Sequence, residues 1–158
     1  MCFELGMYSF GNTPRITDGG YGPTAQAIRN VLEAVKLAED IGLDFFGFGE
    51  HHTRSMPLSS PTSLVTAAAA STERIKLGTT VTVLSTDEPL RVFQQLATAA
   101  ALAPGRIEAV TGRGSSATTR HVIALGSPTS TPFGGCWLSA TWSRGAVSAW
   151  SPWRCKGR

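Results

Sequence analysis

The residues best suited to chemistry are one acid and two histidines that follow a short apolar stretch. Residues Phe45–Phe48 read as a strand, and after one glycine come Glu50, His51 and His52. Carboxylate and imidazole groups can hold, give or take a proton near neutral pH. Because ligands bind at the carboxyl ends of the strands in parallel α/β folds, we predict that these three residues line a catalytic site.

A metal ion fits these residues poorly. Adjacent side chains on a strand point to opposite faces, so His51 and His52 cannot both reach one ion. The third histidine of the chain, His121, lies far away in the sequence. We therefore predict no metal centre. We expect one of the adjacent histidines to orient the other or to bind neighbouring backbone.

A glycine-flanked arginine is the second candidate. Residues 112–117 match GxGxxA, the dinucleotide-binding pattern. However, no helical pattern follows, and no acidic residue lies about 20 positions later to hold a ribose. Arg113, between Gly112 and Gly114, either reaches an anion such as phosphate or lies solvated in a plain turn. The residues alone leave both interpretations open.

The elements that position these residues alternate between strands and helices. Strand patterns cover residues 3–10, 44–49, 75–84 and 106–111, and helical patterns cover residues 24–42, 60–74 and 87–104. The threonines of the third strand are attributed to strand propensity. This order predicts parallel strands with right-handed crossovers. It fits both half of a (β/α)8 barrel and most of a doubly wound sheet, and the pattern does not choose between them.

Local signals define the helix ends and their buried faces. Ser60 and Asp87 are the predicted N-caps, each followed by a proline in the first turn, and Gly42 is the predicted end of the first helix. The spacing of apolar residues predicts which side of each helix is buried. The predicted buried residues are Ile28, Val31, Leu32, Val35 and Ala38 on the first helix, Leu64, Val65, Ala68 and Ala69 on the second, and Phe93, Leu96, Ala97 and Ala100 on the third.

The last 44 residues differ in composition from the rest of the chain. Residues 1–114 contain all 11 acidic residues against 9 basic ones, a net charge of −2. Residues 115–158 contain 5 basic residues and no acid, a net charge of +5, together with all four tryptophans. No helix or strand period persists there, which predicts an irregular, low-order tail. Two interpretations stay open: an end read out of frame, or a genuine basic, aromatic segment able to bind RNA or acidic surfaces.

Composition also argues against several classes of protein. Apolar residues make up 42% of the chain, and no apolar run reaches the length of about 18 residues that a membrane span needs. The first residues lack the basic and then apolar pattern of a signal peptide. The three cysteines show neither CxxC nor metal-ligand spacing, which suits the predicted cytoplasmic location. Because the basic charge lies in the tail alone, nucleic acid is not a predicted partner.

Several longer segments occur in an order known from one family. FELGMYSFG opens the first strand, AEDIGLD closes the first helix, FFGFGEHH ends the second strand, and SSPTSLVTAAAAST begins the second helix. VLSTDEPLRVFQQ and the GRG after the fourth strand follow at fitting distances. This order resembles the bacterial luciferase-like, flavin-dependent monooxygenases. The resemblance covers roughly residues 3–115, and it divides the chain into a partial luciferase-like barrel, residues 1–114, and the tail, residues 115–158.

The resemblance implies an α/β fold, the N-terminal half of a TIM-type (β/α)8 barrel with about four βα units. Such a barrel binds FMN at the C-terminal ends of its strands. Reduced FMN and O2 would oxidise a small organic substrate, with electrons from NAD(P)H or from a partner flavin reductase. The resemblance also makes His51 or His52, beside Glu50, the active-site acid or base.

Four further residues receive a role from the resemblance alone. Thr80 and Val81 match the place where the family often has a non-prolyl cis peptide bond beneath the flavin ring. Gly112 would lie beside the ring, and Arg113 would reach toward the flavin phosphate. These four residues are the predicted cofactor-binding set.

Residues 115–158 depart from the family pattern. The strands and helices that carry the family's main phosphate-binding segments have no counterpart there, so we expect a truncated enzyme and leave its activity open. The alternative is a non-catalytic fragment that joins another chain, a second copy included, through open strand edges and binds acidic partners through its tail. Neither the substrate nor the oligomeric state is predicted.

Overall fold

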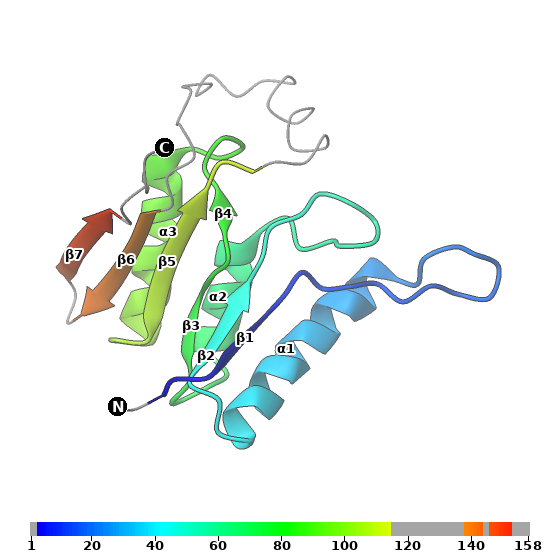
Figure 1. The fold of residues 1–158 in the computed structure, drawn as a ribbon, viewed down its shortest axis with the longest axis horizontal. Coiled ribbons are helices and arrows are strands. Elements are labelled where there is room, and N and C mark those ends of the chain that lie inside the picture. The colour runs from blue at the N-terminus through cyan, green and yellow to red at the C-terminus, as the bar shows by residue number, and fades with distance from the viewer. Residues whose placement is uncertain (1–2, 115–137, 144–145, 153–158) are drawn as a thin grey trace.

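The structure, a computed structural model, describes residues 3–114, 138–143 and 146–152. In these ranges, one seven-stranded sheet carries three helices on one face (Figure 1). The sheet order is β1-β2-β3-β5-β6-β7, with β4 paired to β5. The elements are β1 (Gly6–Ser9), α1 (Thr24–Asp40), β2 (Phe45–Phe48), α2 (Pro61–Ala69), β3 (Lys76–Thr79), β4 (Thr82–Val83), α3 (Pro89–Leu102), β5 (Ile107–Gly112), β6 (Leu138–Ser143) and β7 (Ala146–Pro152).

The strands predicted from the βα order are parallel. β1 pairs with β2, β2 with β3, and β3 with β5, all in parallel register. Met7, Phe46 and Leu77 lie side by side in this register, and Ile107 continues the row on β5. Parallel neighbours require a crossover, and here a helix supplies each one. The predicted α/β class is confirmed.

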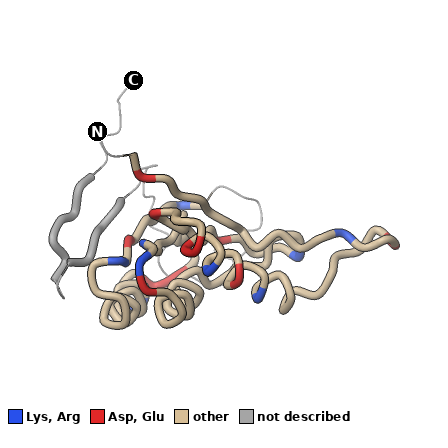
Figure 2. The backbone as a smooth tube through the Cα atoms, turned by 90° about the horizontal axis from the view of Figure 1, so that it is seen from below, with Lys and Arg blue, Asp and Glu red and all other residues tan. Residues whose placement is uncertain are grey.

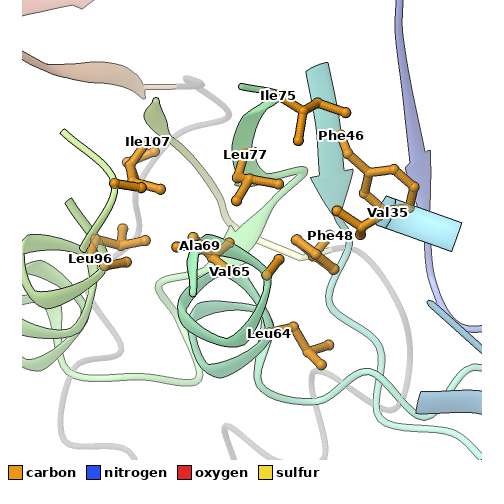
Figure 3. Close-up of a cluster of buried hydrophobic side chains, with 14 of the residues drawn as sticks. Val35, Phe46, Phe48, Leu64, Val65, Ala69, Ile75, Leu77, Leu96 and Ile107 are labelled. Atoms are coloured by element: carbon orange, nitrogen blue, oxygen red, sulfur yellow. The ribbon is translucent and has the colours of Figure 1, made fainter. Parts of the chain in front are cut away.

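The hydrophobic core lies between the helices and the face of the sheet that they cover. Phe46, Phe48 and Leu77 are fully buried on this face. Figure 3 shows Phe46 near Val35 of α1 and Phe48 near Val65 of α2. Fully burying a side chain of this size contributes roughly 1.5–3 kcal/mol. This layer therefore fixes the strands, and hence the residues that follow them.

Helix α1 matches its prediction. Gly42 has a φ of 90°, the left-handed conformation that ends a helix and that glycine adopts without a steric penalty. Ile28 and Leu32 are only partly buried. The residues buried on α1 are Ala27, Val31, Val35 and Ala38, spaced by three or four positions as an amphipathic helix requires.

Helix α2 buries the predicted residues but ends before the predicted position. The pattern extended to Arg74, whereas α2 ends at Ala69. The hydroxyl of Thr72 donates to the carbonyl of Ala68 at 2.7 Å, and the guanidinium of Arg106 donates to the carbonyls of Ala69 and Thr72 at 3.2 and 2.8 Å. Side chains thus satisfy the carbonyl groups at the helix end, so no further turn is needed.

The N-caps differ from their predictions. Ser60 occupies the N-cap position of α2. Its hydroxyl lies 2.8 Å from that of Ser63, and it accepts no backbone N–H of the helix. Helix α3 is capped by Glu88 and not by Asp87, because the carboxylate of Glu88 accepts two backbone N–H groups of the first turn at 3.1 and 2.8 Å. Pro89 begins the helix, so the residue directly before it takes the capping position.

The buried face of α3 is rotated from the predicted one. Phe93, which was predicted to be buried, is 42% exposed. Both the predicted and the observed face contain Leu96 and fit a helical period, so periodicity could not distinguish them. Packing against the sheet decides the rotation. The residues buried on α3 are Val92, Leu96 and Ala99.

The third predicted strand is interrupted. Residues 75–84 form β3 and β4, and the peptide bond between Thr80 and Val81 is cis. Just before this bond, the hydroxyl of Thr79 donates to the carbonyl of Val110 at 2.7 Å and accepts its N–H at 3.0 Å. A side chain therefore replaces a backbone pair between β3 and β5. The predicted cis bond is confirmed, and the prediction of one continuous strand is wrong.

Two strands lie in the tail, where no regular structure was predicted. β6 pairs with β5 in antiparallel orientation, and β7 pairs with β6 in the same way. The free edge of a strand offers a row of N–H and C=O groups to any neighbouring segment. Both segments contain Trp, β6 also contains Thr and β7 contains Val, and these residue types favour extended backbone. β6 and β7 thus extend the sheet from the edge of β5, although the sequence pattern predicted no strand there.

Charged residues of both signs are mixed over residues 3–114. Figure 2 shows Lys and Arg interspersed with Asp and Glu along this part of the chain. A surface of this kind differs from the single-sign stripe that follows a nucleic-acid backbone. Within the described ranges, no helix has the combination of length and apolar character that crossing a bilayer requires.

One carboxylate joins the end of α1 to the start of β3. Oε1 of Glu39 accepts the backbone N–H groups of Glu73, Arg74 and Ile75 at 3.0, 2.6 and 2.9 Å. Burial alone would raise the pKa of Glu39, but these hydrogen bonds outweigh it and hold the pKa below its ordinary value of 4.5. The ionised carboxylate therefore stabilises the fold.

We expect Glu39→Gln to lower the thermal midpoint of unfolding at neutral pH. Because the folded-state pKa is lowered, the stabilisation is present above pH 4.5 and is lost as the pH falls through the folded-state value. The difference in midpoint between the wild type and E39Q, followed by circular dichroism, should therefore shrink below pH 4.5. Glu33→Gln is the control, since this side chain is 70% exposed on the same helix. Equal midpoints for E39Q and the wild type at neutral pH would contradict the prediction.

Candidate active site

The predicted site residues meet at one end of the sheet. Glu50, His51 and His52 follow the C-terminal end of β2. The Thr80–Val81 peptide follows β3, and Gly112 ends β5. Because these strands are parallel neighbours, their C-terminal ends lie along the same edge (Figure 1). This edge is where catalytic residues gather in barrels of this type.

A buried carboxylate lies at the centre of this edge. The side chain of Glu50 is only 4% exposed, and three donors converge on it. Oε2 accepts the N–H of Val83 at 2.7 Å, while Oε1 lies 2.8 Å from Nε2 of His52 and 2.9 Å from Oγ1 of Thr86. These hydrogen bonds replace the water that burial removes. Glu50 thus joins the end of β2 to β4 and to the turn before α3.

The two histidines face different partners. His52 is 20% exposed and directs Nε2 to Glu50. The ring of His51 packs edge-on against Phe10, with centroids 4.8 Å apart and planes at 88°, and its backbone N–H donates to the carbonyl of Leu58 at 2.9 Å. The two rings therefore diverge, as their adjacency predicted. In the part of the chain that the structure describes, no group of three His, Cys, Asp or Glu side chains could hold a metal ion.

Glycines on the inner face of the sheet, the face away from the helices, make room for larger side chains. A Cβ at Gly47 would lie 2.2 Å from Cγ2 of Thr80, and one at Gly78 would lie 3.0 Å from the ring of Phe45. Thr80 and Phe45 therefore lie directly over the backbone of β2 and β3. The hydroxyl of Thr80 is buried there and has no hydrogen-bond partner among the described residues.

An aromatic wall continues the site toward β1. The ring of Phe10 covers Gly49, where a Cβ would lie 2.0 Å from Cε1 of Phe10. Tyr8 meets Phe10 edge-on, with centroids 5.6 Å apart and planes at 79°. Tyr8 is 62% exposed, so the wall formed by Tyr8, Phe10 and His51 opens to solvent. Apolar and aromatic side chains with a few polar groups are typical of sites for small molecules.

The turn after β4 also binds the end of β5. The N–H of Leu84 donates to the carbonyl of Gly112 at 2.9 Å, and the hydroxyl of Ser85 donates to the carbonyl of Arg113. The backbone of Arg113 is therefore held, while the residue as a whole is exposed. A guanidinium in this position can reach an anion, and its contact with a phosphate stays a prediction.

Sequence reasoning missed the residues that hold the site together. Strand propensity explains the threonines of β3 and β4, but it does not explain Ser85 and Thr86, whose hydroxyls bind Arg113 and Glu50. A signal was present, since two hydroxyl residues stand just after a strand and just before a helix. Such residues commonly bind nearby groups instead of packing on a sheet.

A separate group of charges lies at the opposite, N-terminal ends of the strands. Nζ of Lys76 lies 2.8 Å from a carboxylate oxygen of Glu4, and this hydrogen bond raises the pKa of Lys76. Burial raises the pKa of Glu108. The positive charge of Lys76 lowers this pKa by less than burial raises it. These groups are removed from the residues that follow the strands. In (β/α)8 barrels this end of the strands contributes to stability, whereas catalysis takes place at the opposite end.

Comparison with known proteins gives a family match. The model of the family described as luciferase-like monooxygenase matches residues 7–135. The match runs past residue 115, where the resemblance was expected to stop, and residues 115–135 lie outside the described residues. A luciferase-like monooxygenase of Escherichia coli K12 is 33% identical over 101 residues, which are 63% of this chain and 30% of that protein.

A second relative and a solved structure agree with this match. The N-acetyl-S-alkylcysteine monooxygenase of Bacillus subtilis is 32% identical over 96 residues, 60% of this chain and 29% of its own. The chain thus spans no more than about three tenths of these relatives. The oxygenating constituent of 3,6-diketocamphane monooxygenase from Pseudomonas putida, solved with FMN, superimposes with a TM-score of 0.70 at 18% identity, covering 79% of this chain and 33% of its own. This likeness shows the shared fold, part of a TIM barrel.

We expect Gly47→Ala to destabilise the protein, because the added methyl group would lie 2.2 Å from Cγ2 of Thr80. Overpacking of this kind typically costs about 1–3 kcal/mol. Thermal unfolding followed by circular dichroism measures the loss. Gly22→Ala is the matched control, since its added Cβ would meet no atom closer than 3.5 Å.

The double variant G47A/T80A tests the cause of that loss. Thr80→Ala removes the Cγ2 atom, so it should recover part of the stability that Gly47→Ala loses. Additive effects of the two substitutions would show that the contact between residues 47 and 80 is not the cause.

Proposed function

Because the chain belongs to the luciferase-like monooxygenase family, we propose that it is a flavin-dependent monooxygenase chain that uses reduced FMN and O2 to oxidise a small organic substrate. The observation that carries the proposal is the hydrogen-bonded edge that runs from His52 through Glu50 to the turn after β4, and from there to Gly112. Along this edge, an acid–base group adjoins a backbone segment that is fixed by hydrogen bonds and a solvent-exposed wall of aromatic side chains.

The residues present fit a flavin. The buried hydroxyl of Thr80 lacks a partner among the described residues, so it has a hydrogen bond to give to a ligand on the inner face. Exposed Arg113 suits the phosphate, and the wall of Tyr8, Phe10 and His51 suits an aromatic ring system. FMN, when bound and reduced, supplies the electrons that activate O2. The structure of the Pseudomonas putida relative with FMN supports the same cofactor class.

The two histidines receive different roles. Nε2 of His52 is engaged by Glu50, which makes this pair a positioning element. The ring nitrogens of His51 have no hydrogen-bond partner among the described residues, and its ring is held by Phe10. We therefore assign to His51 the holding and moving of a proton at the substrate or cofactor. The sequence left both His51 and His52 open as the acid or base, and we choose His51 because the two rings have different partners.

The reaction needs electrons and a substrate from other molecules. A separate flavin reductase or NAD(P)H supplies the electrons. The substrate is a small organic molecule that the wall of Tyr8, Phe10 and His51 can contact through apolar surface. The printed activity of the Bacillus subtilis relative, oxidation of an N-acetyl-S-alkylcysteine, belongs to that protein and supports only the general class of substrate.

The second candidate function is an assembly module. The observation that favours it is the exposure of large apolar residues at and before β1, where Phe3, Leu5 and Tyr8 are 87%, 64% and 62% exposed. β1 is the end strand of the sheet order, so its outer edge is open to another chain. Size-exclusion chromatography and salt-dependent RNA binding separate the two functions, because the monooxygenase proposal requires neither assembly through β1 nor salt-sensitive RNA affinity.

We expect the protein to bind FMN and to quench its fluorescence, and we expect Thr80→Val to weaken binding about fivefold. Valine keeps the shape of threonine but loses the hydroxyl, and one hydrogen bond contributes about 1 kcal/mol. Titration with oxidised FMN, and with reduced FMN under anaerobic conditions, measures both affinities. Thr98→Val is the control, because Thr98 is exposed on α3 and its hydroxyl bonds only the carbonyl of Gln94. Absence of binding for both forms of FMN would overturn the cofactor proposal.

A further inference from the structure

The residues Val83, Leu84, Ser85 and Thr86, here called the Val83–Thr86 turn, connect β4 to α3 and touch both halves of the site. The N–H of Thr86 donates to the carbonyl of Val83 at 3.0 Å, which closes the turn. The two outer residues of the turn bind the carboxylate of Glu50, and the two inner ones bind the end of β5. One short segment therefore sets the position of Glu50 relative to β5.

The hydroxyl of Thr86 lies within hydrogen-bond distance of two acceptors. Its Oγ1 lies 2.9 Å from Oε1 of Glu50 and 2.8 Å from the carbonyl of Val83, and a hydroxyl has one hydrogen to donate. The carbonyl of Val83 already accepts the N–H of Thr86. The side chain of Glu50 is only 4% exposed, so bulk solvent has little access to replace a lost donor. The hydroxyl therefore contributes more when it donates to Glu50.

The donors around Glu50 determine the tautomer of His52. The N–H of Val83 can only donate, and it occupies Oε2. With Thr86 donating to Oε1, the carboxylate acts as an acceptor throughout, so the hydrogen shared with His52 lies on Nε2. Nδ1 of His52 is then the nitrogen without a hydrogen, and it has no partner among the described residues. This nitrogen can accept a proton or a hydrogen bond.

We propose that Thr86 is a positioning residue: together with the amide of Val83 it fixes the carboxylate of Glu50, which holds the ring of His52 in the Nε2–H form, with the lone pair on Nδ1. The proposal deepens the monooxygenase function stated above and rests on it for the meaning of the site. The hydrogen-bond arrangement itself exists in the protein without flavin, so it can be tested separately.

The test measures the His52 ring directly by ¹⁵N NMR of the labelled protein without flavin, at a pH where the imidazole is neutral. We expect Nε2 to give the signal of a protonated nitrogen and Nδ1 that of an unprotonated one. Thr86→Val should lower the ratio of the Nε2–H to the Nδ1–H form about fivefold, because a carboxylate that has lost its hydrogen bond to Thr86 can turn away from His52. Thr86→Ser, which keeps the hydroxyl, should restore the ratio.

Two controls separate positioning from folding. Thr98→Val repeats the same chemical change on the exposed face of α3 and should leave the ratio unchanged. If Thr86→Val does not fold, Thr86→Ala removes the hydroxyl without placing a methyl group beside the carboxylate of Glu50. A wild-type His52 in the Nδ1–H form, or a ratio unaffected by the loss of the Thr86 hydroxyl, would overturn the proposal. Failure of FMN to bind would leave these signals intact and would count against the proposed function alone.

Discussion

The carboxylate of Glu50 is the interaction on which the site depends. It is removed from water almost completely, at 4% exposure, and it keeps a favourable environment only because three donors from three places in the chain reach it. Breaking one of these contacts leaves a buried acceptor without a partner, which typically costs about 1–3 kcal/mol. The positions of His52, of β4 and of the turn before α3 are therefore coupled through one group.

The two faces of the sheet follow different physical rules. The face toward the helices is built from Phe46, Phe48 and Leu77, and its burial supplies the stability of this part of the chain. The inner face carries glycines, threonines and a few aromatic rings, and no residue in the described part of the chain bonds the buried hydroxyl of Thr80. Unsatisfied polar groups are costly in a core but are expected where a ligand binds. One face thus packs the core, and the other carries the residues of the proposed ligand site.

The spacing of apolar residues and the positions of glycine and proline predicted the βα order and the parallel strands. The residue types that follow the second strand predicted a site at the carboxyl ends of the strands. These signals failed where two solutions fit the same pattern, as on α3, where the face with Phe93 and the face with Val92 share Leu96. They also failed where contacts distant in sequence decide, as when Arg106 ends α2 or when the edge of β5 orders β6. Glu50 and His52 were predicted as candidates from their residue types, whereas the place of Thr86 between a strand and a helix indicates a hydrogen bond but does not identify its partner, which lies 36 positions away.

The glycines of the inner face have a consequence for how related sequences can differ. Gly47, Gly49 and Gly78 each lie beneath a specific larger side chain, those of Thr80, Phe10 and Phe45 in turn. A residue with a Cβ at Gly47 or Gly49 is acceptable only if its covering partner becomes smaller at the same time, whereas at Gly78 the added Cβ would also lie 2.6 Å from the backbone carbonyl oxygen of Glu108. Changes at the two positions of such a pair are therefore non-additive. Divergence on this face must proceed through correlated substitutions, while the helix-covered face can exchange one apolar residue for another of similar volume.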